Sequence, residues 1–240
     1  MGLSISYRLQ LEAASPEVAL DKLQTLHHRA ADFPLLQLGP LVNLQGADCL
    51  FQEDDPHDGV KFGAMTFADF GEFHQQRFHT TPSCSQLIGF AIDPAQGSHT
   101  CSFGLASPAA QPGHWHWFDS CKTQYASNPE YGGIENFLRC HHTIIALLEI
   151  CQELGILQSV SDPSGYWETR DPQVLLDCLR SYNIFTAAAI GSVKDALAPL
   201  GYSAQAPILE RADFEHLEAE GRMQPPASTD SNPIHPAESR

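Results

Sequence analysis

The sequence predicts an α+β fold, with a mixed or antiparallel sheet and helices packed mainly on one face. Two observations favour this class. In several short segments apolar residues alternate with polar ones, which is typical of half-buried strands. In others apolar residues recur every three or four positions, which is typical of amphipathic helices. The chain has 240 residues, 42% hydrophobic and 18% charged, which is enough to build a sizeable core.

The chain opens with a predicted strand, helix and strand. Apolar and polar residues alternate over Ser4–Leu11. Ser15 suits a helix N-cap and Pro16 the first helical position, so a helix begins here. A second strand is expected over Leu35–Leu44. This β-α-β order is compatible with a ferredoxin-like N-terminal half.

Further strands are expected in the middle of the chain, separated by turn-forming Pro, Gly and Asp residues. They cover Lys61–Phe70, Gln86–Ile92, Thr100–Leu105 and Trp115–Phe118. The acidic residues Asp54, Asp55 and Asp58 suggest a calcium loop, but Pro56 and Met65 stand where ligands are needed. We therefore interpret that stretch as a solvated acidic turn.

The clearest helix covers Ile134–Leu154 and ends at Gly155. Its apolar face carries Phe137, His141, Ile144, Ile145, Leu148 and Cys151, and its polar face carries Glu135, Arg139, His142, Glu149 and Glu153. This spacing predicts that the first set packs against the sheet and that the second set faces solvent.

A hairpin is expected after this helix. Leu157–Ser161 would pair with Tyr166–Arg170 across a Pro- and Gly-containing turn, with Trp167 either buried against the long helix, as we favour, or exposed as an anchor for a partner. Two helical segments, Gln173–Tyr182 and Phe185–Leu197, follow.

We expect one domain over residues 1–220, with a subdivision near residue 110 as the alternative. The composition of residues 221–240, rich in Pro, Ser and Asp, predicts a disordered tail.

Charge and cysteine usage restrict the class of protein. The net charge of −16 disfavours nucleic acid as a partner, because phosphate backbones would be repelled. The sequence shows neither a signal peptide nor an apolar run of about 18 residues, so no membrane association is expected. Seven scattered cysteines without a Cys-x-x-Cys pair indicate free thiols and a cytoplasmic protein. No cofactor motif is present, and the hypotheses for a partner are a small anionic ligand or another protein.

The segment from His114 to His142 is the best candidate for a functional surface, because Trp, His and Cys residues concentrate there. His114 and His116 alternate along a strand and are weak metal-ligand candidates, the alternative being that Trp115 and Trp117 face the core while both histidines face water. We therefore expect no metal site.

A second hypothesis for this segment is nucleophilic catalysis. Cys121 and His141 would act as nucleophile and base, with Asp119 orienting the imidazole. The alternative is a buried thiol near a core histidine that already has its hydrogen bonds, which the position of His141 on the apolar face supports.

A third hypothesis is an anion site. A Lys side chain and the N-terminus of the long helix could together hold a carboxylate or phosphate, with aromatic residues forming an apolar wall. The predicted ligand-binding residues are Lys122, Gln124, Gly132, Gly133, Trp117 and Tyr125. The alternative is a plain turn in which Glu130 or Glu135 neutralises Lys122.

Two motifs, Lys122–Tyr125 and Gly165–Asp171, together with Ser6-Tyr7-Arg8 in the first strand, carry a resemblance. The chain resembles a group of uncharacterised bacterial proteins that share a Lys-Thr-Gln-aromatic segment and a Gly-Tyr-Trp-Glu-Thr-Arg-Asp hairpin. That group has no assigned activity, so the resemblance implies a discrete cytoplasmic module and transfers no catalytic residues. The main functional hypothesis is a binding or interaction module with a small-anion site. The alternative is an enzyme, either metal-dependent or Cys/His-based, with its site between His114 and His142.

Overall fold

A seven-stranded antiparallel sheet forms the centre of the fold, which is α+β as the sequence predicts. The computed structural model describes residues 2–13, 15–50, 55–64 and 84–223. The strand order is β2-β4-β5-β6-β1-β7, and β3 also pairs with β4. The strands are β1 (Ser4–Glu12), β2 (Gln37–Leu38), β3 (Val42–Gln45), β4 (Gln86–Asp93), β5 (Cys101–Ser107), β6 (His114–Lys122) and β7 (Leu157–Ser161).

The first strand lies inside the sheet. β1 pairs with β6 along its whole length, from Ser4 opposite Lys122 to Glu12 opposite His114, and with β7 on its other side. Ile5, Tyr7 and Leu9 are buried, as the alternation predicts. This pairing brings the N-terminus of the chain to the C-terminal end of β6.

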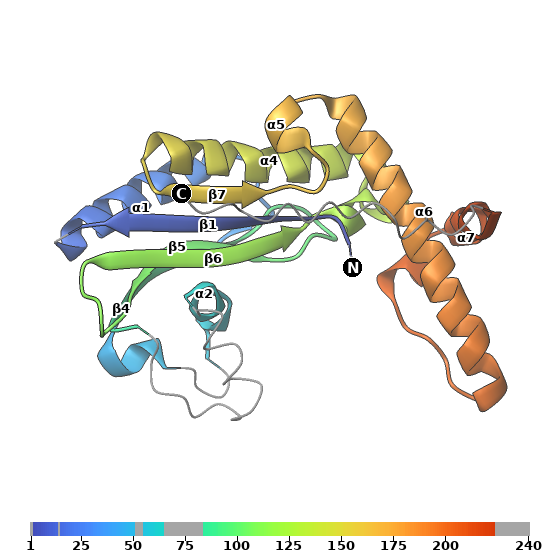
Figure 1. Ribbon diagram of the computed structural model, residues 1–240, viewed down its shortest axis with the longest axis horizontal. Helices are drawn as coiled ribbons and strands as arrows, with labels where there is room; N and C mark the ends of the chain where they lie inside the picture. The colour runs from blue at the N-terminus through green and yellow to red at the C-terminus, as the bar shows by residue number, and fades with distance from the viewer. Residues whose placement is uncertain (1, 14, 51–54, 65–83, 224–240) are drawn as a thin grey trace, which may run out of the picture. The chain divides into compact units, whose positions relative to one another are not determined.

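Two long helices, α1 (Pro16–Ala30) and α4 (Gly133–Glu153), cover one face of the sheet and contact each other. The Phe90 ring of β4 meets His27 of α1 edge to face, with ring centres 4.9 Å apart. Its neighbour Gly89 points the other way and lies against Val60 of the short helix α2 (Asp58–Gly63). α2 therefore covers part of the opposite face, and Figure 1 shows α1 and α4 above β7 and β1 with α2 below β6. Between these layers all seven residues of β5 are buried.

The long helix is confirmed with nearly the predicted bounds. All the residues predicted for its apolar face are buried. The chain enters α4 through Gly132, at φ +100°, and leaves through Gly155, at φ +67°. Both are left-handed conformations that glycine adopts without strain.

The chain divides into two units, residues 1–182 and 183–240. A single helix, α6 (Pro172–Leu197), runs through the region where two helical segments are predicted. In the second unit α7 (Phe214–Met223) packs closely on α6, since a Cβ on Gly221 would lie 2.7 Å from the Cβ of Ala188. The predicted subdivision near residue 110 falls inside the first unit, and the single domain over 1–220 stays a prediction.

Three expectations are corrected or left open. The hairpin after α4 is wrong, because Tyr166–Thr169 forms the short helix α5 and β7 pairs with β1 instead. The predicted strand from Lys61 is wrong over its first four residues, which form the end of α2 and its C-cap Ala64, and residues 65–70 lie outside the described residues. The ferredoxin-like half is not confirmed, since β1 pairs with β6 and β7 while β2 pairs with β4.

The predicted tail begins inside α7, and residues 224–240 lie outside the described part of the chain. Within the described ranges, no helix combines the length and the apolar character needed to cross a membrane.

Candidate functional site

Lys122, the last residue of β6, is the centre of the candidate anion site. Its ammonium nitrogen lies 4.5 Å from the centre of the Tyr125 ring, in a cation–π contact. Gly2 faces it from the start of the chain, and a Cβ there would lie 2.9 Å from Lys122 Nζ. The Lys122 side chain therefore packs directly against Gly2 and fills the space that a side chain at residue 2 would take. The structure thus brings Lys122 and Tyr125 together, as predicted.

Gln124 lies in the same turn but has a structural role. Gln124 Oε1 accepts a hydrogen bond from the backbone N–H of Leu3 at 3.1 Å, and the Leu3 carbonyl accepts from the N–H of Thr123, also at 3.1 Å. The Gln124 side chain is fully buried. It fixes the N-terminus against the 3₁₀ turn Gln124–Ser127, and its carbonyl oxygen is already used.

The positive charge of Lys122 is not neutralised within the described residues. No Asp or Glu carboxylate of this part of the chain lies within ion-pairing distance of its ammonium, and neither Glu130 nor Glu135 pairs with it. The nearby basic group is His99, whose backbone N–H donates to the Lys122 carbonyl at 3.0 Å. Desolvation, and then repulsion by Lys122, lower the pKa of His99.

Gly132 and Gly133 turn the chain into α4. Both adopt positive φ, and their N–H groups donate to the carbonyls of Pro129 and Asn128 at 3.2 and 3.0 Å. These two backbone donors are therefore occupied. This is the geometry of the plain-turn alternative. The two glycines therefore direct the chain into α4 and offer no free backbone N–H to an anion.

Trp117 is buried elsewhere in the sheet. Its indole N–H donates to the Ser102 carbonyl at 3.0 Å, and the ring fills the space left by Gly63 of α2 and Gly104 of β5. With 1% of its surface exposed, it offers no wall to a ligand. The apolar surface beside Lys122 comes from Tyr125.

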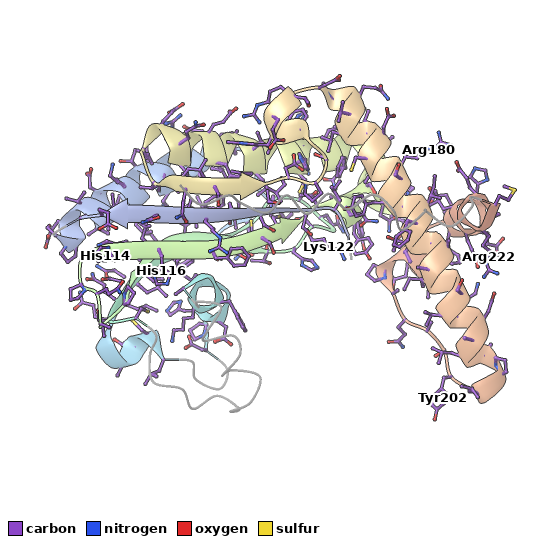
Figure 2. All side chains as sticks on the ribbon, viewed as in Figure 1. His114, His116, Lys122, Arg180, Tyr202 and Arg222 are labelled. Carbon is purple, nitrogen blue, oxygen red and sulfur yellow. The ribbon has the colours of Figure 1, made fainter. Side chains whose placement is uncertain are left out.

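His114 and His116 lie at the other end of β6 from Lys122, as Figure 2 shows. His114 Nδ1 lies 2.7 Å from Glu12 Oε1, and His116 Nε2 lies 3.2 Å from the carbonyl of Ala64. Trp115 and Trp117 are buried, as the alternative predicts. In the portion of the chain that the structure describes, no three His, Cys, Asp or Glu side chains come together as metal ligands.

The Cys121–His141–Asp119 arrangement is not assembled. Hydrogen bonds with Cys101 and Cys140, together with burial, raise the pKa of Cys121 well above its usual value, which leaves a poorly nucleophilic thiol. The Asp119 carboxylate accepts from the backbone N–H groups of Ser102 and Ser120, both at 2.6 Å. It does not orient His141.

His141 instead belongs to a buried polar network that links Thr123, the residue after β6, with α4 and the turn after β7. Its Nδ1 lies 3.3 Å from Thr123 Oγ1 and its Nε2 lies 3.3 Å from Asp162 Oδ2. A neutral ring satisfies both contacts, with Nε2–H donating and Nδ1 accepting. His141 is therefore a core histidine with its hydrogen bonds satisfied, which is the alternative that its position on the apolar face supports.

Asp162 is the residue that sequence reasoning missed. Its two oxygens accept from the backbone N–H and hydroxyl of Ser164, from His141, and from the N–H of Trp167 at 3.0 Å. Burial alone raises its pKa, but the hydrogen bonds from His141 and Ser164 outweigh this and lower the pKa to about 2. The Asp-Pro-Ser-Gly sequence was interpreted only as a turn; an Asp two residues before a Ser also signals this kind of capped turn.

The turn that Asp162 closes leads into a small surface cluster of aromatic and charged residues. Trp167 is half-buried, and the Arg170 guanidinium lies 4.5 Å from its ring centre and 2.8 Å from Glu149. Arg170 is in the left-handed region, at φ +55°. Its charge is already paired, so this cluster is less suited to an anion than Lys122.

The solvated acidic turn predicted near residue 55 is wrong at Asp55, whose side chain is buried. Asp55 forms a buried ion pair with Lys61 and accepts from the N–H of His57 at 2.9 Å. Asp54 lies outside the described residues. The Asp55 carboxylate, which a calcium ion would need as a ligand, is thus already paired with the Lys61 ammonium.

The chain has no match among protein-family models, curated proteins or solved structures.

Proposed function

We propose that this protein is a binding module that holds a small carboxylate or phosphate anion at Lys122. The observation that carries the proposal is the half-buried residue Lys122, whose ammonium contacts the Tyr125 ring and has no carboxylate partner among the described residues. Partial desolvation makes an unneutralised ammonium attract an anion more strongly than a fully solvated one does.

The charge of the chain strengthens this preference. A net charge of −16 repels anions from most of the surface, so a local positive potential stands out. His99 adds a second positive charge when it is protonated. Tyr125 gives a ligand beside the ammonium a flat apolar neighbour.

Catalysis has less support than binding. Thr123, His141 and Asp162 have the hydroxyl–imidazole–carboxylate order of a hydrolase triad. However, Thr123 and His141 are both 0% exposed, so no substrate carbonyl can reach the hydroxyl. We therefore assign this network to stability, and the enzyme alternative stays a prediction without an assembled site.

The test is calorimetric titration with sulfate, inorganic phosphate and acetate at constant ionic strength. Lys122→Gln removes the proposed site. Lys194→Gln is the matched control, because Lys194 also stacks on a ring, 5.0 Å from Phe214, but lies 3.9 Å from the Glu218 carboxylate.

We expect the wild type and Lys194→Gln to bind the same anion equally. Lys122→Gln should weaken binding at least about tenfold, which corresponds to about 1.4 kcal/mol. Unchanged affinity in Lys122→Gln, or no binding of any of the three anions by the wild type, would overturn the proposal.

A further inference from the structure

Two cysteines far apart in the sequence meet at the edge of the sheet, away from Lys122. The β3–β4 ladder ends with Gln45 opposite Gln86, and the Gly46 N–H then donates to the Ser85 carbonyl at 2.9 Å. The 3₁₀ turn Gly46–Cys49 follows on one side, and Cys84 precedes β4 on the other. The two thiols are hydrogen-bonded to each other, and their exposed fractions are 6% and 2%.

The buried ion pair between Lys61 and Asp55 lies close to these thiols. The Lys61 ammonium of α2 donates to the carbonyl of Leu50, the residue after Cys49, at 2.5 Å. The hydrogen bond from Cys84, with added attraction from Lys61, lowers the pKa of Cys49 although burial opposes this. Cys49 therefore forms a thiolate more readily than an ordinary cysteine does.

Three thiols in the centre of the fold are buried to a similar degree, but their pKa is shifted in the opposite direction. Cys121 also contacts two thiols, those of Cys101 and Cys140, but these lie between the sheet and α4. Burial raises the pKa of Cys101 and of Cys151, and thiol hydrogen bonds with burial raise that of Cys121. The raised pKa keeps these thiols protonated, so contact between thiols alone does not make them reactive.

We propose that Cys49 and Cys84 are a redox-sensitive dithiol that a peroxide converts into a disulfide. The Cys49 thiolate attacks one peroxide oxygen, the O–O bond breaks, and hydroxide leaves and is protonated to water, which gives a sulfenic acid at Cys49. Cys84 Sγ then attacks Cys49 Sγ, the S–O bond breaks, and a second water leaves with the thiol proton. In total two thiols lose two electrons, one peroxide is reduced, and one S–S bond forms.

The bond would have a structural consequence. It would join the turn after β3 to the start of β4 and so close the segment that carries α2, a helix that packs on β4, β5 and β6. Oxidation would thus link the two ends of the segment that carries α2 through Cys49 and Cys84. Neither cysteine belongs to the Lys122 site.

The experiment exposes the native, reduced full-length chain to hydrogen peroxide, then denatures it and alkylates the remaining thiols. Of seven cysteines, two should become resistant to alkylation, and peptide mapping should find Cys49 joined to Cys84. In Cys84→Ser, dimedone should trap a sulfenic acid at Cys49, and in Cys49→Ser no early thiol loss should occur.

The central cysteines of the same chain are the internal control, so the mapping remains decisive even where a variant folds poorly. A first disulfide between Cys101 and Cys121, or thiol loss in Cys49→Ser at the wild-type rate, would overturn the proposal. So would a wild-type protein that keeps all seven thiols until it unfolds.

Discussion

Replacing Asp162 by Asn should lower the free energy of unfolding far more than its small change in size suggests. The two carboxylate oxygens accept four hydrogen bonds, two from Ser164, one from His141 and one from Trp167. Asn has a single acceptor oxygen, so its NH₂ group must face at least one of these donor pairs. A buried donor left without an acceptor costs about 1–3 kcal/mol, so two such donors give a total of about 2–6 kcal/mol.

The pKa of Asp162 gives a second estimate of its contribution. The folded-state pKa is about 2 against a usual value of 3.8, a difference that corresponds to about 2 kcal/mol. Because the folded pKa is the lower one, this stabilisation is fully present above about pH 4 and is lost as the pH falls towards about 2. Asp162→Asn should remove that component of the acid sensitivity.

The assay is urea unfolding of both proteins at neutral pH and at several pH values between about 2 and 5. Asp21→Asn, at an exposed position on α1, is the control and should stay within about 0.5 kcal/mol of the wild type. If Asp162→Asn cost no more than this control, or if its acid sensitivity matched that of the wild type, the buried network would not stabilise the fold.

Three further predictions follow from packing and charge. Leu148→Ala, on the buried face of α4, should lower the free energy of unfolding by about 2–5 kcal/mol in urea. Glu149→Ala breaks an exposed ion pair with Arg170 and should lower it by at most about 1 kcal/mol. Equal costs would mean that the buried face of α4 is misassigned. Within α2, Gly63→Ala should destabilise the fold by about 1–3 kcal/mol, because the added Cβ would collide with Trp117. Gly59→Ala has no atom near the added Cβ and should stabilise the fold by up to about 1 kcal/mol. The reverse order would contradict the packing of α2. Sulfate should bind more tightly as the pH falls from about 8 to about 5, because His99 then gains a proton beside Lys122 while the charge of sulfate stays constant. An affinity that does not change with pH, or the same pH dependence in His99→Gln, would show that His99 does not contribute to the site.

The sequence pattern predicted the elements whose faces differ most in polarity. The stripe of α4 and the alternation in β1 both reflect burial on one side, so they can be recognised without a structure. The Tyr166–Arg170 segment misled because its aromatic residues suit a strand, whereas Asp162 caps the Trp167 N–H and starts a helical turn. The pairing of β1 with both β6 and β7 depends on contacts distant in sequence, which local patterns do not encode.

The candidate site was predicted in part. Lys122 and Tyr125 are three residues apart, so a turn was enough to bring them together. Gly2, which precedes β1, and His99, which lies between β4 and β5, are distant from Lys122 in the sequence and could not be recognised beforehand. The resemblance of the Lys122–Tyr125 and Gly165–Asp171 motifs to a bacterial group stays a prediction.

The most direct test of the anion site is to locate a bound anion. Crystals of the full-length protein soaked in selenate, a sulfate analogue with an anomalous signal, should show an anomalous peak in hydrogen-bonding distance of the Lys122 ammonium. The same soak of Lys122→Gln crystals should lack that peak. Selenate bound only at other positions, or bound equally beside residue 122 in the variant, would contradict the assignment of Lys122 as the anion ligand.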